Sequence, residues 1–123
     1  MEFSQPKGIY LQIADQVSDR ILQGEWASGE RIPSIRELAV AIGVNPNTVT
    51  KSYQALLDQS VIENRRGLGY FVTANAKKKI VGEMKTDFVR EQLPRVFKTM
   101  ELLEIDIGEL SDHFAAYKGE NKS

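Results

Sequence analysis

Apolar side chains recur at the spacing of helices through the first part of the chain. From residue 9 to residue 23, isoleucine or valine occupies every fourth position: Ile9, Ile13, Val17 and Ile21. This spacing puts the four side chains on one face of a helix. Gly24 follows and is predicted to end that helix.

Two further helices are predicted from their start signals. Ser34 and Glu37 have the spacing of a capping box, in which each side chain satisfies a backbone N–H of the first turn. Gly43 suits the left-handed residue that closes such a helix. Asn45, as N-cap, and Pro46 open the next helix. Its outward, polar positions are predicted to be Asn47, Lys51, Gln54 and Asp58.

β-forming residues replace the helical pattern after Ser60. They predict strands at residues 61–64 and 70–73, joined by a glycine-bearing turn with Arg65 and Arg66 at its tip. Before the capping box, Pro33 favours a short extended segment over residues 31–33. Two short helices followed by a hairpin form a winged helix-turn-helix, whose second helix enters the major groove of DNA.

The predicted fold is mainly α with a small β-hairpin. A winged helix-turn-helix is expected over residues 1–74 and a short, two-helix dimerisation region over residues 75–123. Compact polar groups and arginines at the helix starts and wing tip suit base edges and phosphates. The predicted DNA-contacting residues are Arg31, Ser34, Arg36, Asn45, Asn47, Thr48, Lys51, Arg65, Arg66 and Gly67. Tyr53 and Tyr70 are interpreted as core or rim residues rather than base-stacking platforms.

The C-terminal region continues the helical spacing. Pro94 is expected to kink or interrupt its first helix near residue 90, and Asp106 with Glu109 repeats the capping pattern. About 50 residues seldom bury enough apolar surface alone, so the stripe should cover the N-terminal domain or a second copy. We favour a homodimer, which would demand a near-palindromic operator. The predicted interface residues are Ile80, Met84, Phe88, Val96, Met100, Leu103, Leu110 and Phe114.

The formal net charge of −1 at first counts against a nucleic-acid binder. By segment, however, the charge is −3 for residues 1–30, +2 for 31–73, +4 for 74–98 and −4 for 99–123. Because binding depends on where charge lies, the basic middle is compatible with selective, moderately salt-sensitive DNA binding. The run Lys77–Lys79 is interpreted as a solvated linker and helix start, with a phosphate contact as the alternative.

Several classes of site and location are not expected. The chain has no cysteine and one histidine, which argues against disulfides, cysteine nucleophiles and zinc or histidine clusters. His113 beside Asp112 is therefore interpreted as structural, and we expect no metal, cofactor or enzymatic activity. The longest apolar run spans only residues 38–44, and the acidic start is unlike a signal peptide. A cytoplasmic protein without a membrane partner is expected.

Three blocks in this order resemble the DNA-binding domain of GntR-family transcription regulators: GERIPSIRELA at 29–39, GVNPNTV at 43–49 and RRGLGYFV at 65–72. The resemblance covers about residues 9–73, and the Asn-Pro-Asn-Thr opening is similar to the YtrA-like subfamily. It implies a bacterial repressor whose DNA contacts include Arg36, Asn45, Asn47, Thr48, Arg66 and Gly67. Pro46 and Thr50 replace arginines that are frequent in the family, so those two contacts are not carried over.

A winged-helix module for protein assembly, without DNA binding, is the alternative. An assembly surface would favour aromatic and aliphatic anchors over the asparagines and arginines found here. The operator sequence, the regulated genes and any small-molecule effector are left unspecified.

Overall fold

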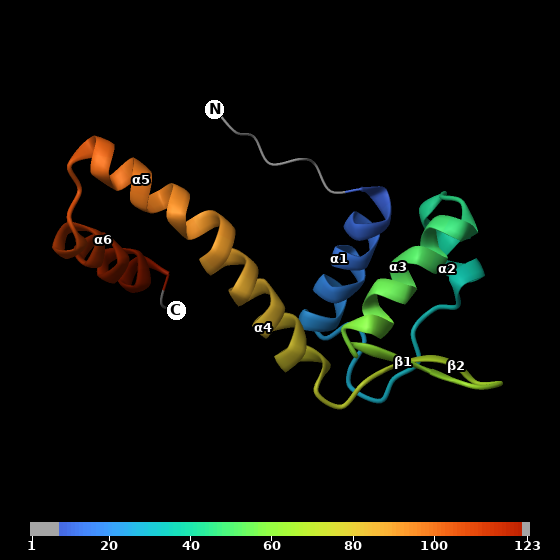
Figure 1. The fold of residues 1–123 in the computed structure, drawn as a ribbon. Helices are drawn as coiled ribbons and strands as arrows, with labels where there is room; N and C mark the ends of the chain where they lie inside the picture. The colour runs from blue at the N-terminus through green and yellow to red at the C-terminus, as the bar shows by residue number, and fades with distance from the viewer. Residues whose placement is uncertain (1–7, 122–123) are drawn as a thin grey trace. The chain divides into compact units, whose positions relative to one another are not determined.

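The computed structural model describes residues 8–121 and divides into two compact units, Met1–Glu83 and Met84–Ser123 (Figure 1). The first unit contains α1 (Ile9–Leu22), α2 (Ile35–Ile42), α3 (Pro46–Asp58), β1 (Ile62–Arg65), β2 (Gly69–Val72) and the start of α4 (Ala76–Asp87). The described part of the second unit contains the end of α4, η1 (Phe88–Gln92), α5 (Leu93–Leu103) and α6 (Ile107–Glu120). The mainly helical winged-helix fold is confirmed. The division between units falls inside α4, whereas the sequence predicted a boundary after residue 74.

The helix starts follow the local signals in the sequence. Ser34 Oγ accepts the Glu37 N–H at 3.0 Å, and Glu37 Oε1 accepts the Ser34 N–H at 2.9 Å, which completes the capping box of α2. Gly43 closes α2 in the left-handed conformation, with φ of 71°. Asn45 Oδ1 accepts the Asn47 N–H at 2.8 Å at the start of α3. Helix-turn-helix geometry is thus fixed by short-range bonds at both helix starts.

A single hydrophobic core holds the first unit together. The buried face of α1 lies against α3, and the wing strands and the first turns of α4 complete the cluster. Trp26 is half-buried against this core, with the Arg20 guanidinium 5.4 Å from its ring centroid. The buried residues include Ile13, Val17, Ile21, Val49, Tyr53, Leu56, Val61, Val72, Ala76 and Ile80.

The wing is an antiparallel pair in which Ile62 lies opposite Val72 and Arg65 opposite Gly69. The extended segment before α2 runs along the outer side of β2. Its hydrogen bonds join the Gly29 N–H to the Val72 carbonyl, the Val72 N–H to the Glu30 carbonyl and the Ile32 N–H to the Tyr70 carbonyl, each at 2.9 Å. The segment that precedes α2 is therefore bonded directly to the wing.

The second unit is helical, as predicted. Pro94 has no N–H for the carbonyl four residues earlier, and the α-helix gives way at Phe88–Gln92 to the wider turn η1, where the Leu93 N–H bonds to the Phe88 carbonyl. Asp106 Oδ1 accepts the Glu109 N–H at 2.8 Å and begins α6. Within residues 8–121, no helix has the length and apolar character needed to cross a bilayer.

Candidate nucleic-acid interface

The exposed face of α3 carries amide and amino groups. Asn47 and Lys51 are exposed, whereas Val49 and Tyr53 on the other side of the helix are buried. The Oδ1 atom of Asn45 is occupied by its capping bond, which leaves its amide NH₂ as the group that can donate to DNA. Side-chain amides pair with adenine edges, and a lysine can reach a guanine or a phosphate.

The threonines of the same helix are less available. Thr48 is half-buried, and its backbone N–H donates to the Asn45 carbonyl at 3.0 Å. Thr50 Oγ1 donates to the Pro46 carbonyl at 3.0 Å. The two asparagines and Lys51 therefore offer more side-chain groups to a groove than the threonines do.

The start of α2 presents a positive group beside the capping box. Arg36 is exposed, and its side chain forms no hydrogen bond or ion pair within residues 8–121. Hydrogen bonds from the backbone and side chain of Ser34, together with the charge of Arg31, hold the pKa of Glu37 below its ordinary value of 4.5. Glu37 is thus ionised at neutral pH and keeps the box closed beside Arg36.

Arg31 lies against the wing. Its guanidinium is 4.0 Å from Glu37 Oε1, and its side chain remains 55% exposed. A Cβ atom added to Gly69 would lie 2.9 Å from Arg31 Nε, so the glycine leaves the room that the arginine occupies. This contact brings the segment before α2 and the wing to one surface.

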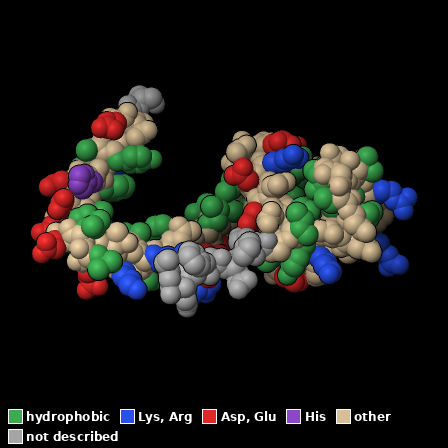
Figure 2. Space-filling model, turned by 90° about the horizontal axis from the view of Figure 1, so that it is seen from above, with side chains coloured by type: hydrophobic (Ala, Val, Ile, Leu, Met, Phe, Trp, Pro, Cys, Tyr) green, Lys and Arg blue, Asp and Glu red, His purple; other side chains and the backbone are tan. Residues whose placement is uncertain are grey.

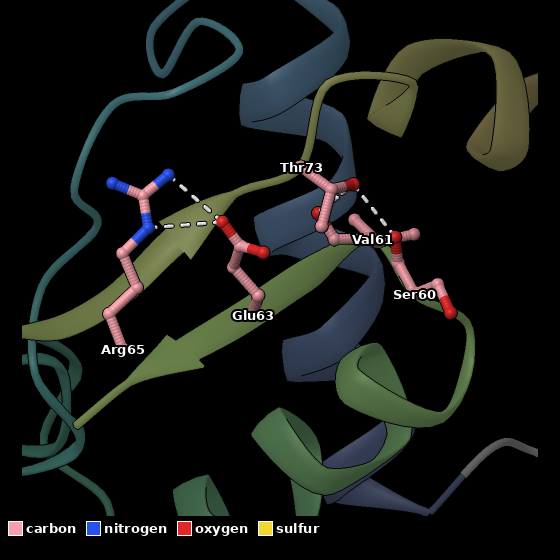
Figure 3. A network of polar contacts seen from close by, with 5 residues as sticks. All are labelled: Ser60, Val61, Glu63, Arg65 and Thr73. Atoms are coloured by element: carbon pink, nitrogen blue, oxygen red, sulfur yellow. Dashed lines mark hydrogen bonds and ion pairs between the residues drawn. The ribbon is translucent and has the colours of Figure 1, made fainter.

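The two arginines at the wing tip differ in their surroundings. Arg65 Nε and Nη2 donate to Glu63 Oε1 at 3.0 and 2.9 Å (Figure 3), and the guanidinium lies 4.1 Å from the Phe71 ring centroid. Arg66 is exposed and has no such partner within the described residues. Of the pair, Arg66 is the one whose charge is available to a ligand.

The base of the wing is closed by a second group of bonds. Thr73 Oγ1 lies 2.7 Å from the Ser60 carbonyl and 3.1 Å from the Val61 carbonyl (Figure 3). Lys79 Nζ also donates to the Ser60 carbonyl at 3.1 Å. One lysine of the run at 77–79 therefore has an internal partner.

The relatives of this chain decide its family. Residues 9–72 match the family described as bacterial regulatory proteins, gntR family. The chain belongs to the GntR family. It is a DNA-binding transcriptional regulator, and the assembly-module alternative is not favoured.

Individual GntR relatives agree with this assignment. The transcriptional repressor YtrA of Bacillus subtilis is 36% identical over 104 residues, which cover 85% of this chain and 79% of YtrA. A crystal structure of a putative GntR regulator from Bacteroides thetaiotaomicron is 41% identical, covers 93% of this chain and 100% of its own, and superposes with a TM-score of 0.85. The DNA-binding domain of AraR, crystallised with operator ORR3, is 29% identical over 59% of this chain and 95% of its own, with a TM-score of 0.50. The resemblance to YtrA-like regulators is confirmed.

Several residues of this GntR domain were missed by the sequence interpretation. Gly69, Glu63 and Phe71 act on the predicted arginines from neighbouring positions of the hairpin. Tyr53 was expected only to pack, yet its hydroxyl donates to the Pro33 carbonyl at 2.6 Å. A tyrosine on an inward helical face was the available signal, since a buried phenol needs a hydrogen-bond acceptor.

The regulator's second unit combines acidic and apolar surface (Figure 2). Five of the residues predicted to form a dimer interface are exposed: Met84, Phe88, Val96, Leu103 and Phe114. Leu110 is half-buried, and Met100 is only 8% exposed. Further exposed apolar side chains in this unit, not singled out from the sequence, are Val89, Phe97, Leu102, Ile107 and Tyr117.

Ile80 requires a correction. It is 3% exposed and belongs to the core of the winged-helix unit, because α4 begins by packing there through Ala76 and Ile80. A side chain that its own domain already covers offers no surface to a second chain.

Proposed function

We propose that this GntR regulator is a repressor that binds a near-palindromic operator as a homodimer. The observation that carries the proposal is a set of exposed side-chain donors on one DNA-binding fold that have no partner within residues 8–121. They are Asn47 and Lys51 on α3, Arg36 on α2 and Arg66 on the wing. YtrA, named as a repressor, and AraR, crystallised with an operator, support this role. Acting on bacterial DNA, the regulator works in the cytoplasm.

The proposed contacts fall into two groups. Asn45, Asn47 and Lys51 read base edges from the major groove, with Thr48 in a supporting position. The remaining residues contact the backbone or the minor groove beside it: Arg31, Ser34, Arg36, Arg66 and the close-approaching backbone of Gly67. Arg65 acts on the wing instead, because Glu63 and Phe71 engage it.

The proposed homodimer rests on the apolar surface of the second unit. Phe88 and Phe114 are 44% and 61% exposed, and this small unit carries several more large apolar side chains on its surface. Apolar surface on this scale is typical of a protein interface. A two-fold dimer would place two copies of α3 about one DNA turn apart. Since one protomer supplies few phosphate contacts, paired binding also explains how a chain of net charge −1 holds DNA.

Selection of bound duplexes from a randomised pool, followed by measured affinities, tests operator binding. We expect an enriched inverted repeat and weaker binding by Arg36→Ala and Asn47→Ala, both of which should fold normally. Arg90→Ala is the matched control, because it removes an exposed arginine that pairs with Asp87 at 3.0 Å in the second unit. A pool without enrichment, or equal losses in all three variants, contradicts specific binding by these residues.

The homodimer is tested by sedimentation of the wild type and of Phe114→Glu at micromolar concentration. We expect a dimer that the charged substitution dissociates. A monomeric wild type, with and without DNA, refutes this part of the proposal. Repression itself is tested with a reporter gene placed behind the selected operator, and expression that rises with the regulator would refute it.

A further inference from the structure

One buried side chain meets all three parts of the candidate DNA interface. Tyr53 is on the inner face of α3 and is 1% exposed. Its hydroxyl donates to the Pro33 carbonyl at 2.6 Å, and its ring meets Tyr70 of β2 edge-on, with centroids 4.9 Å apart and an interplanar angle of 79°. Tyr53 thus joins the recognition helix to the segment before α2 and to the wing.

The acceptor of this bond, the Pro33 carbonyl, lies in the chain between two arginines of the candidate interface. Pro33 follows the ladder that joins residues 29–32 to β2, and it directly precedes Ser34, the N-cap of α2. Arg31 lies two residues before Pro33, and Arg36 lies three residues after it. A displacement of the Pro33 carbonyl would therefore move both arginines relative to α3.

The hydroxyl of Tyr53 also keeps its proton at neutral pH. Burial, with a smaller effect of Tyr70, raises the pKa of the Tyr53 phenol above its ordinary value of 10.0. The phenol is protonated at neutral pH and continues to donate.

We propose that Tyr53 is a positioning residue for operator recognition. Its hydroxyl fixes the distance between the arginines around α2 and the amides on α3, and its ring contact with Tyr70 does the same for the wing. This inference rests on the proposed operator binding. Base contacts are hydrogen bonds with narrow limits of distance and angle, whereas charge attraction to phosphates varies slowly with distance. Loss of the hydroxyl should therefore weaken operator binding more than binding to unrelated DNA.

The test is Tyr53→Phe, which keeps the ring and removes only the hydroxyl. The measured quantity is the ratio of affinities for the selected operator and for an unrelated duplex of equal length, at one salt concentration. We expect the ratio to fall about fivefold to tenfold, the scale that one hydrogen bond supplies. Affinity for the unrelated duplex should change little.

Ser52→Ala is the matched control. Ser52 is the neighbouring residue on α3, is fully buried, and its hydroxyl lies 2.6 Å from the Tyr10 carbonyl on α1 and 3.0 Å from the Thr48 carbonyl. The substitution thus removes a buried hydroxyl that links α3 to α1, a helix for which no DNA contact is proposed. We expect this variant to lose stability and to keep the wild-type affinity ratio.

The outcomes separate the two proposals. A selective wild type with an equally selective Tyr53→Phe overturns the role of Tyr53 alone, as does an equal fall in the ratio for Ser52→Ala. A wild-type ratio near one overturns operator recognition and the positioning role together. Circular dichroism and thermal melting establish that each variant is folded; should Tyr53→Phe unfold, Tyr70→Leu, which removes the ring contact from the wing side, must lower the ratio or the proposal fails.

Discussion

Substitution of Gly69 by alanine perturbs the wing in two ways that can be separated. The backbone has φ of 113°, a conformation that side chains strongly disfavour, and the new Cβ would lie 2.9 Å from Arg31 Nε. Gly67 in the same turn has φ of 78° and no atom within 4 Å of an added Cβ. Gly67→Ala should therefore cost about 1 kcal/mol of unfolding free energy from backbone strain alone, and Gly69→Ala about 2–4 kcal/mol.

A double-mutant cycle with Arg31→Ala isolates the steric part. Removing the arginine makes room for the Cβ, so the cost of Gly69→Ala should fall by about 1 kcal/mol in the Arg31→Ala background. Urea unfolding followed by circular dichroism gives each free energy, at one protomer concentration because dimerisation would make stability concentration-dependent. Equal costs for the two glycine substitutions, with no change in the Arg31→Ala background, would refute the reasoning.

Three further results are expected. Arg66→Ala should weaken DNA binding and reduce the salt slope by about one, whereas Arg65→Ala should mainly destabilise the wing; the opposite assignment would contradict the ion pair with Glu63 as the deciding feature. Ser34→Ala should lower the unfolding free energy by about 1 kcal/mol, and an unchanged melting curve would count against the capping box. Because the folded pKa of Glu37 is below 4.5, its stabilising effect is complete above that pH and disappears as the pH falls through the lower, folded value. Glu37→Gln should therefore lose less stability on acidification than the wild type, as measured by melting at a series of pH values.

Local signals in the sequence were sufficient for the helices and the wing. The bonds that begin α2 and α3 join residues two or three positions apart, so the spacing of Ser34 with Glu37 and the Asn45 cap already contained them. The hairpin likewise followed from β-forming residues around a glycine-bearing turn. Such short-range interactions do not depend on how the rest of the chain folds.

Features that depend on tertiary packing could not be predicted from the sequence pattern. Arg65 and Arg66 are adjacent, chemically identical and both exposed. Only the positions of Glu63 and Phe71 engage Arg65, while Arg66 has no such partner within residues 8–121. Helical spacing likewise identified an apolar stripe that includes Ile80. It did not indicate whether the same domain or a second chain covers that stripe. The pairing of residues 29–32 with β2 joins segments some forty residues apart, which no local pattern reveals.

The wider turn η1 at Phe88–Gln92 changes the direction in which the side chains after it point around the helix axis. A regular α-helix would carry Val96 ~120° around the axis from Met84. The π-turn takes back ~90° of that rotation by using more residues per turn. By this arithmetic, Met84 and Val96, which are 58% and 39% exposed, lie on nearly the same side of the helix axis, one before and one after Pro94. A regular α-helix with one residue fewer and no proline would place its apolar side chains on the same side. What this part of the helix must preserve is therefore the direction in which its apolar side chains point, and not its number of residues.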